Sequence, residues 1–334
     1  METQAIQQQF FTHLKQSLPA HLSLVDELCD LLDISADSVY RRLRGEKPVT
    51  IDELKKICDH YHLSMDQLLQ LNNESVLFRA PGLNSVSNEF LDYLKMSVGL
   101  LKYFNSFKKM EFFYLCKDIP LWDFYIIPEM AAFKTFFWSK TLNNHPELRD
   151  KSFSFAEYPF IDCFAVAQTL LEEYNKMSGV ELWNLESINS TINQISYYKE
   201  AGLFKTEEDF DLVVNAFIKT LDHIQLEAEK GHKFMRGASE VSYKQPLRFY
   251  INELVLGNNT ILVDTEERKM AVITYSIFNP LITTDSRFIE KSFNNFNTLL
   301  SRSTMISGTG EKDRNRFFNA LRNKVYTLKK LVNA

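Results

Sequence analysis

The sequence predicts a mainly α-helical protein of two domains: an N-terminal five-helix bundle and a larger α-rich domain that contains a small antiparallel β-meander. Three observations predict this fold class. Capping residues divide the first 72 residues into short amphipathic segments. A stretch rich in Asn and Ser then separates two regions of different texture. Alternation of apolar and polar residues with a period of two, which is typical of β-strands, is confined to residues 247–278.

Composition narrows the class of protein. A chain of 334 residues with 45% hydrophobic residues can bury two cores of ordinary size. The first ten residues lack the basic and apolar regions of a signal peptide, and no apolar run is long enough to span a bilayer, so we expect a cytoplasmic protein without a membrane partner. The four cysteines form no CxxC pair, which indicates neither a zinc site nor a disulfide framework. We expect no cofactor.

Five helices are expected in the first domain, residues 1–72. The first covers residues 4–17, where apolar side chains recur every four positions. Ser23 begins the second helix, and Ser35 is an N-cap for the third, which runs to about residue 44. Thr50 with Glu53 forms a capping box for the fourth helix. Ser64 starts a fifth that continues to residue 71.

The third helix presents cations outward. A rotation of about 100° per residue places Ala36, Val39 and Leu43 on one side, which we expect to be buried. Opposite them lie Asp37, Arg41 and Arg44, and the flanks carry Ser38, Tyr40 and Arg42. A short helix that exposes arginines directly after a tight turn is the arrangement that a helix-turn-helix places in the major groove. Arginine forks suit guanine, and hydroxyl groups suit phosphates or base edges.

Residues 25–69 resemble the Cro/C1-type helix-turn-helix domain (lambda-repressor-like, XRE family) in helix order, turn lengths and the terminal LSMDQLL segment. The resemblance covers about a fifth of the chain. It implies that the third helix lies against DNA and that the loop with Arg44, Gly45 and Lys47 touches phosphates. The residues expected to contact DNA are Ser35, Asp37, Ser38, Tyr40, Arg41, Arg42, Arg44 and Lys47.

Four positions depart from the family pattern. Cys29 replaces a small residue of the brace helix, and Asp33 replaces the glycine of the turn. Ala36 stands where the recognition helix often starts with glutamine, and Leu43 stands where an acidic residue is frequent. The target sequence therefore cannot be inferred by analogy. The first 72 residues hold 7 basic and 11 acidic residues, but residues 41–47 concentrate four cations with one carboxylate.

The second domain, residues 89–334, follows a linker at 73–88. Residues 103–164 are dense in aromatic side chains, which favours a large helical core, with an aromatic-lined pocket or a dimer face as the alternatives. Helices are expected at residues 160–176, 209–229, 285–301 and 312–331. Three segments, RFYINELVL, NTILVDTE and KMAVITYSIF, are expected to form the antiparallel meander.

These features predict a sequence-specific DNA-binding transcriptional regulator, not an enzyme, because no catalytic motif occurs. Its expected partners are double-stranded DNA, a second copy of the chain, and a small-molecule or peptide effector of the second domain. Two alternatives remain open: a protein-interaction module such as an antitoxin or adaptor, and a peptide-sensing regulator. Against the latter, no repeat near 34 residues is found.

Overall fold

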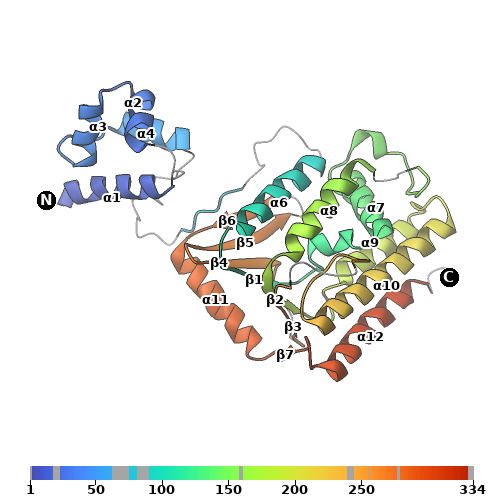
Figure 1. The fold of residues 1–334 in the computed structure, drawn as a ribbon. Helices are drawn as coiled ribbons and strands as arrows, with labels where there is room; N and C mark the ends of the chain where they lie inside the picture. Colours follow the sequence, from blue (N-terminus) through green and yellow to red (C-terminus); the bar gives the residue numbers. More distant parts are fainter. Residues whose placement is uncertain are drawn as a thin grey trace. The chain divides into compact units, whose positions relative to one another are not determined.

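The protein is described by a computed structural model, shown in Figure 1, that covers residues 2–17, 23–61, 75–80, 90–157, 161–238, 244–254, 256–276 and 279–329. It divides into two compact units, residues 1–77 and 78–334. The expected fifth helix at 64–71 lies outside the described residues, as does most of the expected linker at 73–88.

The described part of the first unit consists of α1 (Glu2–Ser17), α2 (Leu24–Leu32), α3 (Ala36–Leu43) and α4 (Ile51–Tyr61). These four helices match the expected order. Their shared core includes Phe10, Leu14, Leu28, Val39 and Ile57. Ala36 was expected to be buried, but it is exposed at the start of α3.

A seven-stranded mixed sheet forms the centre of the second unit, in the order β6-β5-β4-β1-β2-β3-β7. The adjacent strands β1, β2 and β3 are parallel, and every other neighbouring pair in the sheet is antiparallel. The strands are β1 (Met110–Leu115), β2 (Ser178–Trp183), β3 (Leu247–Ile251), β4 (Thr260–Thr265), β5 (Lys269–Ser276), β6 (Asn279–Thr283) and β7 (Thr304–Met305).

Helices cover both faces of this sheet (Figure 1). One face packs against α11 (Ser286–Leu300), which contributes Ile289 and Phe296 to a small core. The other face carries the main core. The helices of the main core are α6 (Phe90–Asn105), α7 (Pro128–Phe137), α8 (Ile161–Asn175), α9 (Asn189–Glu200), α10 (Glu207–Lys230) and α12 (Glu311–Leu328). The 3₁₀ turn η1 (Leu121–Tyr125), which precedes α7, also contributes side chains to this core.

The small antiparallel meander predicted at 247–278 is wrong, and so is the fold class built on it. Only β4 and β5 pair as expected, because β1 and β2 lie between β3 and β4 and make β3 parallel to β2. Strands buried on both faces show continuous apolar runs without alternation. The segment MEFFYL lies within residues 103–164, which were expected to form a helical core, and SGVELW was not predicted as a strand.

A buried ionic network lies beside β2, next to the main core. Glu181 of β2 is fully buried and pairs with Lys233 at 2.5 Å. Its carboxylate also accepts hydrogen bonds from the Tyr174 hydroxyl at 2.6 Å and from the Trp183 indole N–H at 2.9 Å. Asp123 is equally buried, but its side chain has no hydrogen-bond partner among the described residues. The single ammonium of this network thus lies nearest to Glu181.

Burial raises the pKa of Asp123 well above its usual range, and the nearby carboxylates of Glu181 and Glu227 raise it further against the opposing effect of Lys233. A carboxyl group with a raised pKa binds its proton more tightly in the folded state, so stability falls as pH rises above the unfolded value of about 3.9. Asp123→Asn removes this dependence. As the pH rises above about 3.9, we expect the free energy of unfolding of Asp123→Asn to increase relative to that of the wild type. The increase is up to about 1.4 kcal/mol per pH unit and ends when the pH passes the raised pKa of Asp123.

Urea unfolding at several pH values, followed by tryptophan fluorescence, measures this difference. All three tryptophans lie in the second unit, so the signal reports on that unit. A stability difference between Asp123→Asn and wild type that stays constant with pH would contradict the assignment.

Candidate nucleic-acid interface

Two capped helices and a tight turn position α3. The Ser23 hydroxyl accepts a hydrogen bond from the Asp26 N–H and begins α2. Asp33 ends α2 in the left-handed conformation, with φ of 54°, at the position where a glycine is frequent in the family that the sequence resembles. Ser35 then caps α3 by accepting from the Ser38 N–H at 3.4 Å. The predicted helix-turn-helix geometry of α2 and α3 is therefore formed.

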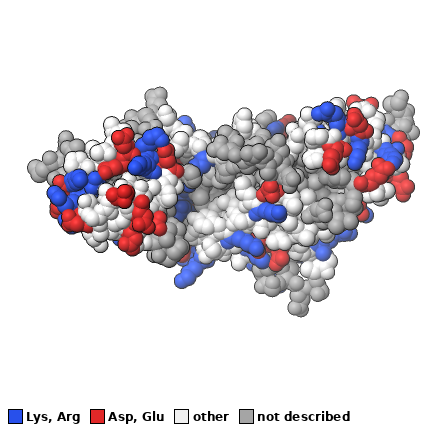
Figure 2. Space-filling view, turned by 90° about the horizontal axis from the view of Figure 1, so that it is seen from above, with Lys and Arg blue, Asp and Glu red and all other residues white. Residues whose placement is uncertain are grey.

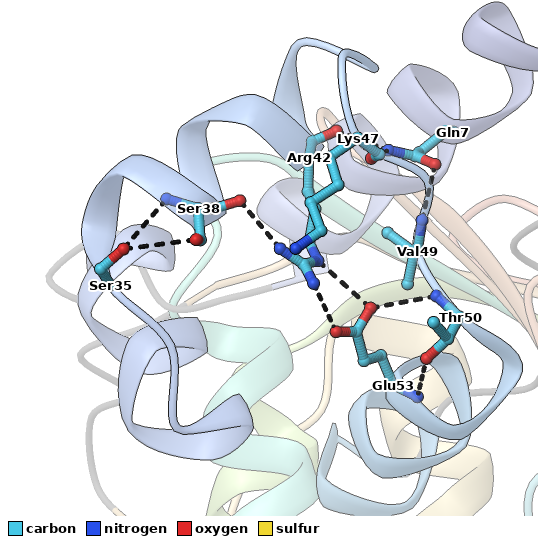
Figure 3. A network of polar contacts seen from close by, with 8 residues as sticks. All are labelled: Gln7, Ser35, Ser38, Arg42, Lys47, Val49, Thr50 and Glu53. Carbon is cyan, nitrogen blue, oxygen red and sulfur yellow. Dashed lines mark hydrogen bonds and ion pairs between the residues drawn. The ribbon is translucent and has the colours of Figure 1, made fainter.

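Arg42 belongs to the core of this unit and not to its surface. Only 4% of the residue is exposed, and its guanidinium makes two bonds to the carboxylate of Glu53 on α4, at 2.6 and 3.2 Å (Figure 3). A third bond reaches the Ser38 carbonyl at 3.1 Å. All three guanidinium nitrogens of Arg42 therefore make hydrogen bonds inside the unit. The structure gives Arg42 a supporting role, and its contact with DNA stays a prediction.

Glu53 also completes the predicted capping box of α4. Its carboxylate accepts from the Thr50 N–H at 3.0 Å, and the Thr50 hydroxyl accepts from the Glu53 N–H at 3.2 Å. The Arg42 guanidinium and the Thr50 N–H hold the pKa of Glu53 below its usual value, although burial opposes them. One carboxylate thus joins the C-terminal half of α3 to the start of α4.

Gln7 of α1 fixes the loop between α3 and α4 from the other side (Figure 3). Its amide N–H groups donate to the carbonyls of Arg42 at 2.7 Å and Lys47 at 2.8 Å. Its amide oxygen accepts from the Val49 N–H at 3.0 Å. The neighbouring Gln8 donates to the Arg44 carbonyl at 2.9 Å. The backbone of the loop is therefore held in one shape before any ligand arrives.

Of the four cations in residues 41–47, three are exposed at the surface: Arg41, Arg44 and Lys47. The side chains of Arg41 and Arg44 are 53% and 54% exposed. Glu46 lies between them and makes two bonds to Arg44, at 2.6 and 3.0 Å, and a looser ion pair with Arg41 at 3.9 Å. The hydrogen bond from Arg44 holds the pKa of Glu46 below its usual value. An exposed carboxylate thus occupies the donors that a phosphate would use.

The remaining predicted residues lie on or next to this surface. Asp37 and Tyr40 are exposed on α3, and Tyr40 keeps 48% of its surface accessible. Ser35 is exposed at the helix start, whereas Ser38 is half-buried and bonded to Ser35. No ion pair between Asp37 and Arg41 is found in the described part of the chain. The candidate interface, defined from here on, comprises Ser35, Asp37, Ser38, Tyr40, Arg41, Arg44 and Lys47.

On the face drawn in Figure 2, the described basic residues form no broad surface of one sign. On the face drawn in Figure 2, Lys and Arg side chains lie beside Asp and Glu side chains. Nonspecific attraction to a polyanion is weak for such a surface. Contact with nucleic acid at the candidate interface must therefore depend on a few well-placed donors.

Sequence reasoning missed the supporting roles of Gln7, Glu46 and Glu53. The sequence predicted Glu53 only as a capping residue, and its pairing with Arg42, eleven residues earlier in the chain, had no local signal. The contact of Gln7 across 35 to 42 residues had no local signal. It depends on how α1 packs against α3.

Comparison with known families agrees with this location. Residues 6–96 match the family model of the BetR domain, a DNA-binding domain of helix-turn-helix type. The match covers about a quarter of the chain and includes the whole candidate interface. Searches of curated proteins and of solved structures found no match.

Two further findings concern other kinds of site. Within the described ranges, no three His, Cys, Asp or Glu side chains are grouped so that they could hold a metal ion. Among the helices that the structure describes, none combines the length and apolar character needed to cross a membrane.

Replacing Arg42 with alanine should destabilise the first unit, because Glu53 is left partly buried without its partner. The pair is not fully buried, with 5% and 18% of the side chains exposed, so we expect a loss of roughly 2–4 kcal/mol. Hydrogen–deuterium exchange of the full-length protein measures this loss in peptides from α3 and α4. Arg41→Ala is the matched control, and equal exchange in the two variants would contradict the structural role of Arg42.

Proposed function

We propose that this protein is a sequence-specific DNA-binding transcriptional regulator of the Cro/C1 (XRE) type that acts in the cytoplasm by binding and not by catalysis. In this proposal α3 enters the major groove, and α2 braces it across the backbone. The observation that carries the proposal is the set of three exposed cations at the end of α3 and in the following loop, on a unit that matches a DNA-binding domain.

The position of each cation suggests a separate task. Arg41 lies within α3, so its guanidinium fork can reach a base edge, where guanine presents two acceptors. Arg44 and Lys47 lie at the helix end and in the loop held by Gln7 and Gln8, a location suited to phosphate contacts. Tyr40 offers a hydroxyl for either partner.

We further propose that the protein acts as a homodimer through its second unit. Two copies related by a two-fold axis would place their recognition helices about 34 Å apart, one turn of DNA. The operator is then an inverted repeat of two half-sites. A pair of α3 helices also compensates for the small number of cations in each copy.

The main alternative is a protein-interaction module that uses the bundle to bind another protein. The peptide-sensing alternative assumed a stack of helical repeats, whereas the second unit is built around a seven-stranded sheet. Binding of the purified protein to DNA separates the regulator from the interaction module directly.

Selection from a random duplex pool at near-physiological salt tests the proposal. We expect the full-length protein to enrich a two-fold symmetric motif. Enrichment of one isolated half-site would contradict the homodimer, and the absence of any enriched motif would contradict specific DNA binding by the unliganded protein.

On the selected duplex, Arg41→Ala should weaken binding by about 1–3 kcal/mol and relax the preference at one base pair. Lys55→Ala is the matched control, because it removes a cation from the exposed part of α4. Competition against duplexes substituted at each position measures the effect. A uniform loss of affinity across all these duplexes would assign Arg41 to a phosphate instead.

Glu46→Gln should strengthen binding, because it frees the donors of Arg41 and Arg44 for DNA. We expect a roughly two- to tenfold gain in affinity and a steeper decrease of affinity with salt, by about one in the logarithmic slope. Asp59→Asn, which removes an equal charge from α4 next to Lys55, is the control. An equal gain in both variants would show a general charge effect and contradict a local role of Glu46.

A further inference from the structure

A cavity of 360 Å³ lies between α6 and the sheet of the second unit. Met96, Gly99 and Leu100 of α6 form one side of it. Side chains of β1, β4, β5 and β6 form the opposite side, and Leu121 and Trp122 of η1 close one end. This volume is within the range of pockets that hold small molecules in proteins.

The lining is apolar and carries no charge among the described residues. Transfer of an unpaired ion into such surroundings costs several kcal/mol or more, because no counter-ion replaces its hydration shell. A ligand that carries a carboxylate, a phosphate or an ammonium group is therefore disfavoured. The lining is suited to a neutral and mainly apolar molecule.

Tyr114 supplies a polar group without a partner. Phe112 and Tyr114 alternate with Phe113 along β1, so they point to the face that carries the main core and the cavity. Tyr114 is 5% exposed, and its hydroxyl makes no hydrogen bond with a described residue. Burial raises its pKa well above the usual value, so the hydroxyl keeps its proton and can donate or accept.

The aromatic wall beside Tyr114 is held rigidly. The rings of Trp122 and Tyr174 lie 4.3 Å apart between centroids, and the Tyr174 hydroxyl donates to the buried Glu181. Lys233 pairs with the same carboxylate and lies 4.4 Å from the centroid of the Tyr174 ring. The ionic network thus fixes one wall of the cavity, which lowers the conformational entropy lost on binding.

The side of the cavity formed by the sheet also includes Pro280 and Ile282 of β6. Ile282 exchanges two backbone hydrogen bonds with Arg79, at 2.7 and 2.8 Å. Arg79 follows the end of the first unit at Leu77 by two residues. A molecule in the cavity therefore contacts the strand to which the connecting segment is hydrogen-bonded.

We propose that this cavity binds a neutral, mainly apolar small molecule whose single polar group lies beside the Tyr114 hydroxyl. The proposal concerns the second unit alone and is independent of DNA binding by the first. Its test therefore contains no DNA, so its failure leaves the proposed regulatory function untouched.

The test compares two fluorescent probes of the same skeleton on the full-length protein. N-phenylnaphthylamine is neutral, and anilinonaphthalenesulfonate adds one negative charge. We expect the neutral probe to bind at least about tenfold more tightly, because the cavity offers the sulfonate no counter-ion. Equal affinities, or tighter binding of the sulfonate, would overturn the proposal.

Two variants locate the bound probe. A Cβ atom at Gly99 would meet nothing within 4 Å, so Gly99→Phe places a ring at the cavity without a backbone clash and should abolish binding of the neutral probe. Lys95→Phe, on an exposed position of α6 that does not line the cavity, is the matched control and should leave the affinity unchanged.

Tyr114→Phe keeps the ring and removes only the hydroxyl. Because that hydroxyl has no hydrogen-bond partner among the described residues, the variant should fold as stably as the wild type. We expect it to weaken binding of the neutral probe by roughly two- to tenfold. Unchanged affinity in both Gly99→Phe and Tyr114→Phe would show that the probe binds elsewhere and would refute the site.

Discussion

The ion pair between Arg42 and Glu53 determines the arrangement of the first unit. The pair joins α3 to α4, and the Glu53 carboxylate also completes the capping box of α4. Because α3 is oriented with the Arg42 side chain buried, the side chains of Arg41 and Arg44 are exposed. Gln7 then fixes the carbonyls of the following loop. The shape of the candidate interface therefore follows from one buried charge pair and one amide side chain.

This arrangement also explains how an acidic protein can present a surface to DNA. One arginine of the cluster is neutralised in the core, and Glu46 moderates two of the three exposed cations. In the proposed function, weak general attraction leaves discrimination to contacts with bases. In the second unit, a buried ionic network lies behind a cavity whose described lining residues carry no charge. Each unit thus contains one buried charge pair, Arg42 with Glu53 in the first and Lys233 with Glu181 in the second.

The sequence was informative where local rules decide the structure. The caps at Ser23, Ser35 and Thr50 predicted the helix starts of the first unit. The helices expected at residues 285–301 and 312–331 are formed as α11 and α12. The sequence was misleading where tertiary contacts decide. Nothing near Arg42 in the chain showed that its charge is buried, and the parallel pairing of β1, β2 and β3 joins segments about 70 residues apart. Strands covered on both faces lack the alternation that identifies a strand.

Backbone amide protection on binding the selected duplex tests the central claim most directly. Hydrogen–deuterium exchange of the full-length protein, with and without that duplex, reports every segment of the first unit at once. The account predicts new protection in α3 and in the loop from Arg44 to Lys47, with the exposed side of α4 unchanged. Protection confined to α4 or to the second unit, with α3 unaffected, would contradict it.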